Sequence, residues 1–175
     1  RHEPGWLVER RTEAARAFAT LPLPTTRLRP WKYTDVSALD FGAFPPAELT
    51  VTIDGPAPGN GGAGAATLEA AQTALGVDFA EDAWARVVPA TEGKFAAANA
   101  ALSSQPIVVH APRGAAPGTP IIIDLASHEA GPASVYPRLL IRLEEQAELT
   151  VVLRLTSGET PLLVAGVIEV QAAQA

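Results

Sequence analysis

Apolar residues recur at helical spacing in the first part of the chain. Leu7, Ala14 and Phe18 fall on one face of residues 4–20, which is typical of an amphipathic helix, and Pro22 ends the pattern. An alternating strand is expected at 49–53. Further helices are predicted over residues 68–75, 79–88 and 92–102.

The pattern changes near residue 106, where short β-rich segments separated by Pro- or Gly-containing turns begin. Strands are predicted over residues 107–110, 121–125, 139–143, 149–153 and 162–170. Spacings of this kind are typical of a sandwich, a barrel or a β-solenoid. The pattern therefore predicts a mainly helical region over 1–105 and a β-rich region over 106–175.

A Gly/Pro-rich and nearly uncharged stretch, residues 54–66, is expected to be a surface loop. Within it, Gly59 to Gly64 matches the G-x-G-x-x-G pattern of dinucleotide-binding folds. In such folds the first Gly directly follows a strand, whereas here five residues intervene after the strand at 49–53. No Lys-Ser/Thr pair follows the glycines, so a P-loop is excluded and a simple loop is favoured.

No catalytic, cofactor-binding or metal-binding residue is predicted. The chain has no Cys, which excludes disulfides and thiolate ligands for zinc or an iron–sulfur cluster. None of His2, His110 and His128 has a ligand partner at suitable spacing on its own element, and the roles of His110 and His128 stay open. Glu144 and Glu145 are adjacent, so on a strand they point to opposite faces. The chain is not expected to be an enzyme.

Composition narrows the possible partners. The 175 residues carry a net charge of -6, which disfavours nucleic acid, and no apolar run approaches the ~20 residues of a membrane span. A cytoplasmic location is expected, because no signal peptide is visible. The chain contains no Met and begins at Arg1, which predicts a piece of a longer protein.

The richest cluster of functional groups is the segment Arg29–Asp35, with sequence RPWKYTD. It contains one of three Trp and one of two Tyr residues. Its spacing suits neither a catalytic triad nor a metal. We expect Trp31 and Tyr33 to pin an extended segment onto a hydrophobic surface, with Arg29 or Lys32 stacked on a ring or paired to Asp35. Such aromatic anchors also occur at protein interfaces.

Several motifs in order resemble SufD, a scaffold subunit of the SufBCD iron–sulfur cluster assembly complex. They are EPxWL with RRxxA at residues 3–14, LPLP at 21–24, RxWKYTD at 29–35, KFxAxNxAL at 94–102, PIxI at 120–123 and PRxLI at 137–141. SufB shares the core domain but is less similar to the Trp31–Asp35 segment. The resemblance implies an α+β fold: a helical N-terminal region followed by the start of a right-handed β-helix, or β-solenoid, truncated in this chain.

The resemblance also implies a non-enzymatic role in protein–protein assembly. SufB-like and SufC-like (ATPase) proteins are the implied partners, with neither nucleic acid nor a membrane involved. The whole complex assembles the iron–sulfur cluster, so no cofactor is expected in this chain. Members of the family are longer, and many have an Asn in the strand that aligns with 162–166, where this chain has none. The alternative is an unrelated β-solenoid binding module for a carbohydrate or protein ligand. A nucleotide-dependent oxidoreductase is disfavoured, because the Gly-rich loop on which it would depend does not fit a dinucleotide site.

Overall fold

A computed structural model describes residues 3–59 and 61–173. The helices within these residues are α1 (Gly5–Thr20), α2 (Leu68–Leu75), α3 (Val77–Ala83) and α4 (Lys94–Leu102), with short 3-10 turns η1 (Arg29–Trp31), η2 (Phe41–Ala43) and η3 (Ala90–Glu92). The strands are β1 (Thr50–Asp54), β2 (Gly64–Thr67), β3 (Ile107–Ala111), β4 (Ile121–Ser127), β5 (Ala133–Val135), β6 (Arg138–Leu143), β7 (Val151–Ser157), β8 (Leu162–Val164) and β9 (Val167–Ala172).

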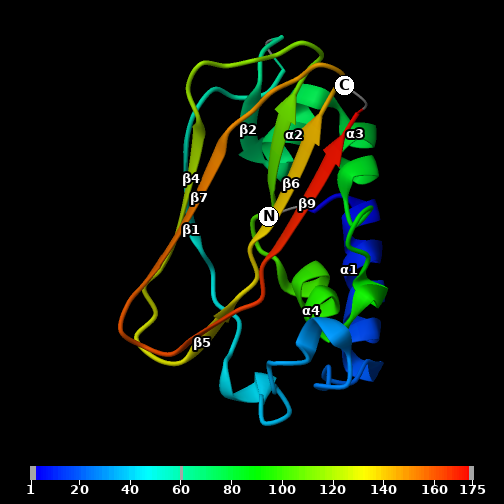
Figure 1. The fold of residues 1–175 in the computed structure, drawn as a ribbon, viewed down its shortest axis with the longest axis vertical. Coiled ribbons are helices and arrows are strands. Elements are labelled where there is room, and N and C mark those ends of the chain that lie inside the picture. Colours follow the sequence, from blue (N-terminus) through cyan, green and yellow to red (C-terminus); the bar gives the residue numbers. More distant parts are fainter. Residues whose placement is uncertain (1–2, 60, 174–175) are drawn as a thin grey trace.

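The strands form three separate sheets, ordered β1-β4-β7, β2-β3-β6-β9 and β5-β8 (Figure 1). The first strand of each larger sheet is antiparallel to its neighbour, as in the pairing of β1 with β4 and of β2 with β3. All the other pairs are parallel. Parallel partners lie about thirty positions apart in sequence, for example Ile121 with Val151.

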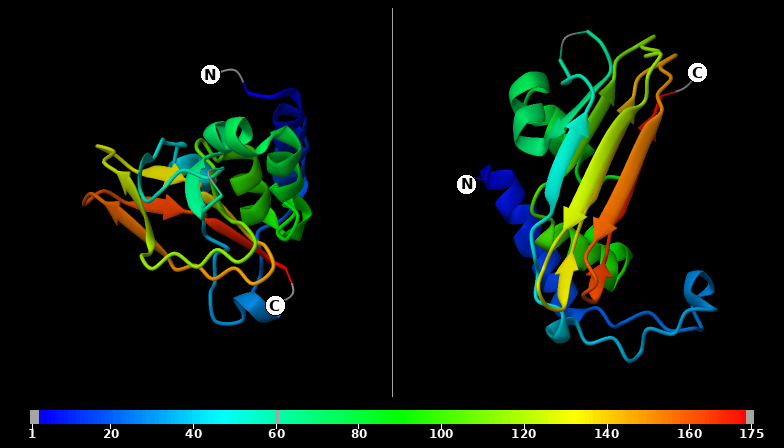
Figure 2. Two further views of the ribbon diagram at one scale, coloured as in Figure 1. Left: turned by 90° about the horizontal axis from the view of Figure 1, so that it is seen from above. Right: turned by 90° about the vertical axis from the view of Figure 1, so that its left-hand side faces the viewer.

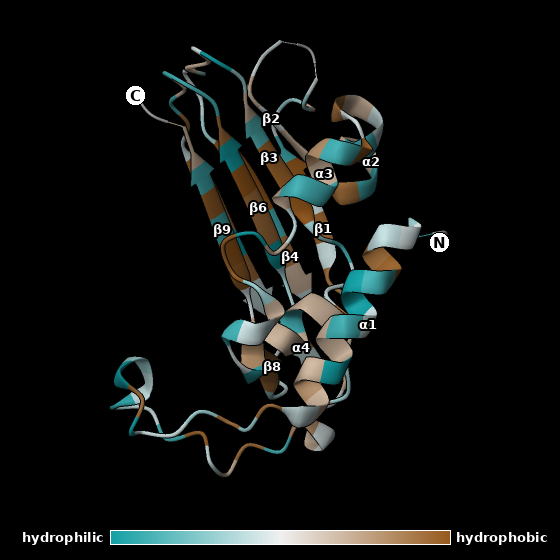
Figure 3. Ribbon diagram, turned by 90° about the vertical axis from the view of Figure 1, so that its right-hand side faces the viewer, coloured by the Kyte–Doolittle hydropathy of each residue, from teal (hydrophilic) through white to brown (hydrophobic). Residues whose placement is uncertain are grey.

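The helices cover one face of the four-stranded sheet, and the three-stranded sheet lies on its other side (Figures 1 and 3). One core packs α1, α2 and α3 against that sheet through residues such as Leu7, Trp84 and Val108. A second core lies between the larger sheets and includes Val109 and Ile123. Strand β3 is buried along its whole length because successive side chains enter these two cores in turn.

The predicted fold, a helical region followed by a right-handed β-helix, is wrong. The chain is mixed α/β: β1 and β2 precede α2 and enter the two larger sheets as antiparallel strands. Among the described residues the sheets are separate, and none is closed or a solenoid. Strand β2 was overlooked because its residues, GAAT, lack the β-branched pattern of a strand. Its backbone packs closely, since a Cβ at Gly64 would lie 2.4 Å from the carbonyl carbon of Ala57.

Single elements follow the sequence patterns unevenly. Helix α2 spans the predicted residues 68–75, and Gly76 follows it with a positive φ of 97°. The strand predicted over 162–170 is split, because Ala165, which is buried, and Gly166, which is exposed, lie outside strand geometry between β8 and β9. The helix predicted over 79–88 instead spans Val77–Ala83, and Trp84 continues as extended chain.

Candidate interaction surface

Strands β7, β8 and β9 are the last strands of their sheets and run along one side of the molecule (Figure 2). Each pairs with a neighbour on one side, and the described residues place no strand on its other side. Their outer backbone N–H and C=O groups are therefore open to a further strand or chain. Natural proteins commonly cover or blunt such edges.

The inner faces of these edge strands are apolar but incompletely covered. Leu153 is the register partner of Ile123 and shares its face, yet Leu153 is 37% exposed while Ile123 is fully buried. In the other sheet, Ile168 is 53% exposed beside Leu139, which is buried. The exposed fraction of paired side chains therefore rises sharply from the inner strand to the edge strand beside it.

A cavity of about 200 Å³ opens between the edge strands. Leu153, Leu155, Val164 and Ile168 line it together with residues of the second core. Exposed aliphatic side chains around an apolar cavity are typical of a surface that associates with protein rather than with a polar solute. The surface formed by the edge strands β7, β8 and β9 is therefore the candidate interaction surface, and we call it the open edge.

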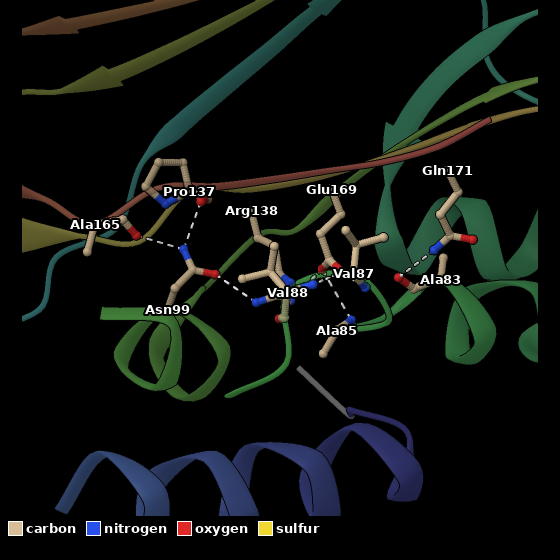
Figure 4. A network of polar contacts seen from close by, with 10 residues as sticks. All are labelled: Ala83, Ala85, Val87, Val88, Asn99, Pro137, Arg138, Ala165, Glu169 and Gln171. Carbon is tan, nitrogen blue, oxygen red and sulfur yellow. Dashed lines mark hydrogen bonds and ion pairs between the residues drawn. The ribbon is translucent and has the colours of Figure 1, made fainter. Parts of the chain in front are cut away.

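A buried polar network holds the other face of β9 against the helices (Figure 4). Glu169 pairs in register with Leu140 and so points to the helical side. Its carboxylate accepts hydrogen bonds from the backbone N–H groups of Ala85 at 3.2 Å, Val87 at 2.8 Å and Val88 at 3.0 Å. One side chain on β9 therefore fixes the segment between α3 and η3.

Arg138 on β6 completes this network. Its Nη2 lies 2.5 Å from the Oε1 atom of Glu169, and its Nη1 donates to Asn99 on α4 at 3.0 Å. The Asn99 amide donates in turn to the backbone carbonyls of Pro137 and Ala165. Burial lowers the pKa of Arg138, and the Glu169 carboxylate opposes that shift by favouring the charged form. Both charges are shut off from solvent, so the network suits positioning and not proton transfer with a substrate.

Of the three histidines considered as candidate ligands, the structure describes His110 and His128, and His2 lies outside the described residues. His110 is nearly buried, and its Nε2 lies 3.0 Å from Oε1 of Glu144, while His128 is exposed. Glu145 pairs with Arg113 instead, so the adjacent glutamates form no working carboxylate pair. The hydrogen bond from His110, joined by the backbone N–H of Arg113, lowers the pKa of Glu144.

The predicted anchoring by aromatics is half right. Trp31 stacks on Phe95 of α4, with ring centroids 5.1 Å apart and an interplanar angle of 16°. Tyr33, in contrast, is 90% exposed, and its ring is approached by the Nζ of Lys32 at 5.2 Å. Asp35 accepts a hydrogen bond from the N–H of Ser37, which lowers the pKa of Asp35 and leaves the bases of this segment without that partner.

The remaining sequence candidates yield no chemical site. Asn60 of the Gly-rich stretch lies outside the described residues; Gly64 belongs to β2 and not to a loop that leads directly into a helix. Across the described part of the chain, no group of three or more His, Cys, Asp or Glu residues is arranged to hold a metal ion. No helix described here is long and apolar enough to cross a membrane.

Sequence reasoning missed the Arg138–Glu169 pair. Arg138 appeared only in a family motif, and Glu169 occupied an ordinary polar position in an alternating strand. The local signal in the described strands is a charged residue between apolar neighbours, with Arg138 first in β6 and Glu169 third in β9.

Comparisons with known proteins do not identify a family for this chain. No protein-family model matches the chain, and no curated protein matches it either.

Proposed function

We propose that the chain is the N-terminal part of a SufD-like scaffold subunit and acts by protein–protein assembly. The proposal rests on the ordered motifs from EPxWL to PRxLI and on their resemblance to that family. By the same resemblance its partners are a SufB-like protein and a SufC-like ATPase. The iron–sulfur cluster is cargo of the whole assembly and not a cofactor of this chain.

The open edge is the structural observation that supports a scaffold role most directly. Leu153, Leu155 and Ile168 are large aliphatic side chains on core-facing positions, and they remain partly exposed beside unpaired strand edges. A surface of this type is covered by further strands or by another protein surface, through β-strand pairing and apolar contact. Small-molecule sites are typically mostly apolar pockets of about 300–1,000 Å³, and the cavity at the open edge is smaller, about 200 Å³.

Three of the motifs also contribute residues to packing and hydrogen bonding inside the protein. Asn99, from the KFxAxNxAL motif, and Arg138, from the PRxLI motif, meet in the buried network at 3.0 Å. Trp31, from RxWKYTD, stacks on Phe95 from KFxAxNxAL. Residues from these motifs, distant in sequence, therefore pack against one another in the fold.

Co-expression with a SufB-like and a SufC-like protein from the same source tests the proposal. A tagged chain should retain at least one of the two through affinity purification and size-exclusion chromatography in moderate salt. A variant carrying Leu153→Lys and Ile168→Lys should retain less, while Glu159→Lys, on an exposed position, serves as a matched control. Absence of any association with either protein would sink the proposal.

A further inference from the structure

A basic arm stands apart from the acidic remainder of the chain. Residues 27–33, which read RLRPWKY, include three cations and no carboxylate, whereas the chain as a whole has a net charge of -6. Arg27, Arg29 and Lys32 are all exposed. The arm belongs to the extended segment that leaves the body of the molecule after α1 (Figures 2 and 3).

The backbone of the arm is organised before any partner binds. Successive turns are closed by hydrogen bonds from Leu28 N to Thr25 O at 3.0 Å, from Trp31 N to Leu28 O at 2.9 Å and from Thr34 N to Trp31 O at 2.9 Å. Pro30 fixes φ inside η1, and the Trp31 ring rests on Phe95. A fixed backbone lowers the conformational entropy lost on binding.

Two apolar side chains of this arm point away from the protein. Tyr33 is 90% exposed and Leu28 is 53% exposed, although Trp31 between them is packed. Tyr and Arg are enriched among the residues that contribute most to protein–protein binding, because each can bury a large side-chain surface and also form hydrogen bonds. A groove of about 670 Å³ beside the arm, lined by Trp31, Leu39, Phe95 and Val164, extends this apolar surface toward β8.

Charge complementarity selects the chemistry of the partner. Three cations around a projecting phenol fit a protein surface that presents carboxylates around an apolar pocket. Single-stranded nucleic acid is a poorer fit, because one free ring provides no series of stacking platforms. A membrane is also a poorer fit, because Leu28 and Tyr33 bury little area and no amphipathic helix accompanies them.

We propose that residues 27–33 form a docking epitope for an acidic protein partner, with Tyr33 as the anchor in an apolar pocket. The inference rests on the proposed function, because the partner is taken to be a subunit of the same assembly. The arm is a contact separate from the open edge, so the two surfaces can be tested with different variants.

The test measures affinity of the purified chain for the SufB-like and the SufC-like protein, each alone. Tyr33→Ala should weaken one of these complexes by about tenfold or more, and Tyr33→Phe should bind closer to the original chain. The triple variant Arg27→Glu, Arg29→Glu and Lys32→Glu should weaken the same complex and remove most of its salt dependence. A matched triple reversal at Arg10, Arg86 and Arg113, three exposed cations outside the arm, controls for net charge.

The outcomes separate the two proposals. If the complexes form and the arm variants bind as tightly as the original chain, the docking epitope is wrong while the scaffold role stands. If no complex forms with the original chain, both proposals fail. Arm-dependent binding to a 20-nucleotide RNA, to phosphatidylserine vesicles or to a second copy of the chain, without a subunit complex that needs Tyr33, would also overturn the assignment.

Discussion

Arg138 and Glu169 form an ion pair between two neighbouring parallel strands, and neither side chain is accessible to water. The pair is reinforced by hydrogen bonds to Asn99 and to the backbone of residues 85–88. Removing one member leaves a buried charge without its counter-charge, which costs more than the pair itself contributes.

We therefore expect Glu169→Ala to lower the free energy of unfolding by about 3–5 kcal/mol. The double variant Arg138→Met with Glu169→Ala should be less damaging than Glu169→Ala alone, because no unpaired charge remains. Urea denaturation followed by circular dichroism measures both, with Glu159→Ala as an exposed control. Equal losses in the single and double variants would show that the charge pairing is not what matters.

Trp31 and Tyr33 should differ in their effect on stability. Trp31→Ala removes the stacking contact with Phe95 and should destabilise the fold by about 1–3 kcal/mol, whereas Tyr33→Ala should change it by less than about 0.5 kcal/mol. Trypsin should also cleave after Arg27 or Lys32 faster in the Trp31 variant; the bond after Arg29 is resistant because Pro30 follows it. Similar melting temperatures and cleavage rates for the two variants would contradict the observed packing.

The open edge should promote self-association of the isolated chain. Ile168→Lys should reduce concentration-dependent association in sedimentation velocity at little cost in stability, because that side chain is already half exposed. A substitution in the covered core, Ile123→Ala, should cost about 2–5 kcal/mol and leave association unreduced. A strictly monomeric original chain at high concentration would refute this prediction.

Glu144 should contribute to the loss of folding stability at acid pH. Its pKa is lowered in the folded chain by the hydrogen bond from His110, so its contribution to stability is present above the unfolded pKa of about 4.3. That contribution declines as the pH falls through the lower, folded pKa. Unfolding free energies measured between pH 3 and 7 should fall less steeply at the acid end for Glu144→Gln than for the original chain. Glu148→Gln, at an exposed position, is the control and should follow the original chain.

Local signals in the sequence were read more successfully than long-range ones. Helix α2 has a Thr67 cap and a following glycine, both visible within a few residues. Whether a strand runs parallel or antiparallel to its neighbour is decided by distant segments, so the pattern of β1 could not reveal its antiparallel pairing with β4. That is where the predicted β-helix failed.

The candidate surface and the buried network could be predicted only in part from the sequence, because both depend on contacts between distant segments. In the strand predicted over residues 162–170, nothing in the sequence indicates that Glu169 is buried against the helical side. The backbone N–H groups that Glu169 binds, those of Ala85, Val87 and Val88, lie 81 or more positions earlier in the sequence, so its burial depends on tertiary packing. Likewise, nothing in RPWKY distinguishes the packed Trp31 from the exposed Tyr33.

Parallel pairing between strands about thirty residues apart, as in Ile121 with Val151, bears on how quickly the chain folds. Each such pair requires closure of a long loop before its hydrogen bonds and side-chain contacts can form. Chains dominated by non-local pairing fold slowly, in the range of about milliseconds to seconds. During synthesis β4 emerges before β7, so its outward side waits unpaired until the next thirty residues have been translated. Translation rate and chaperone access would then influence the yield of folded protein as much as its final stability.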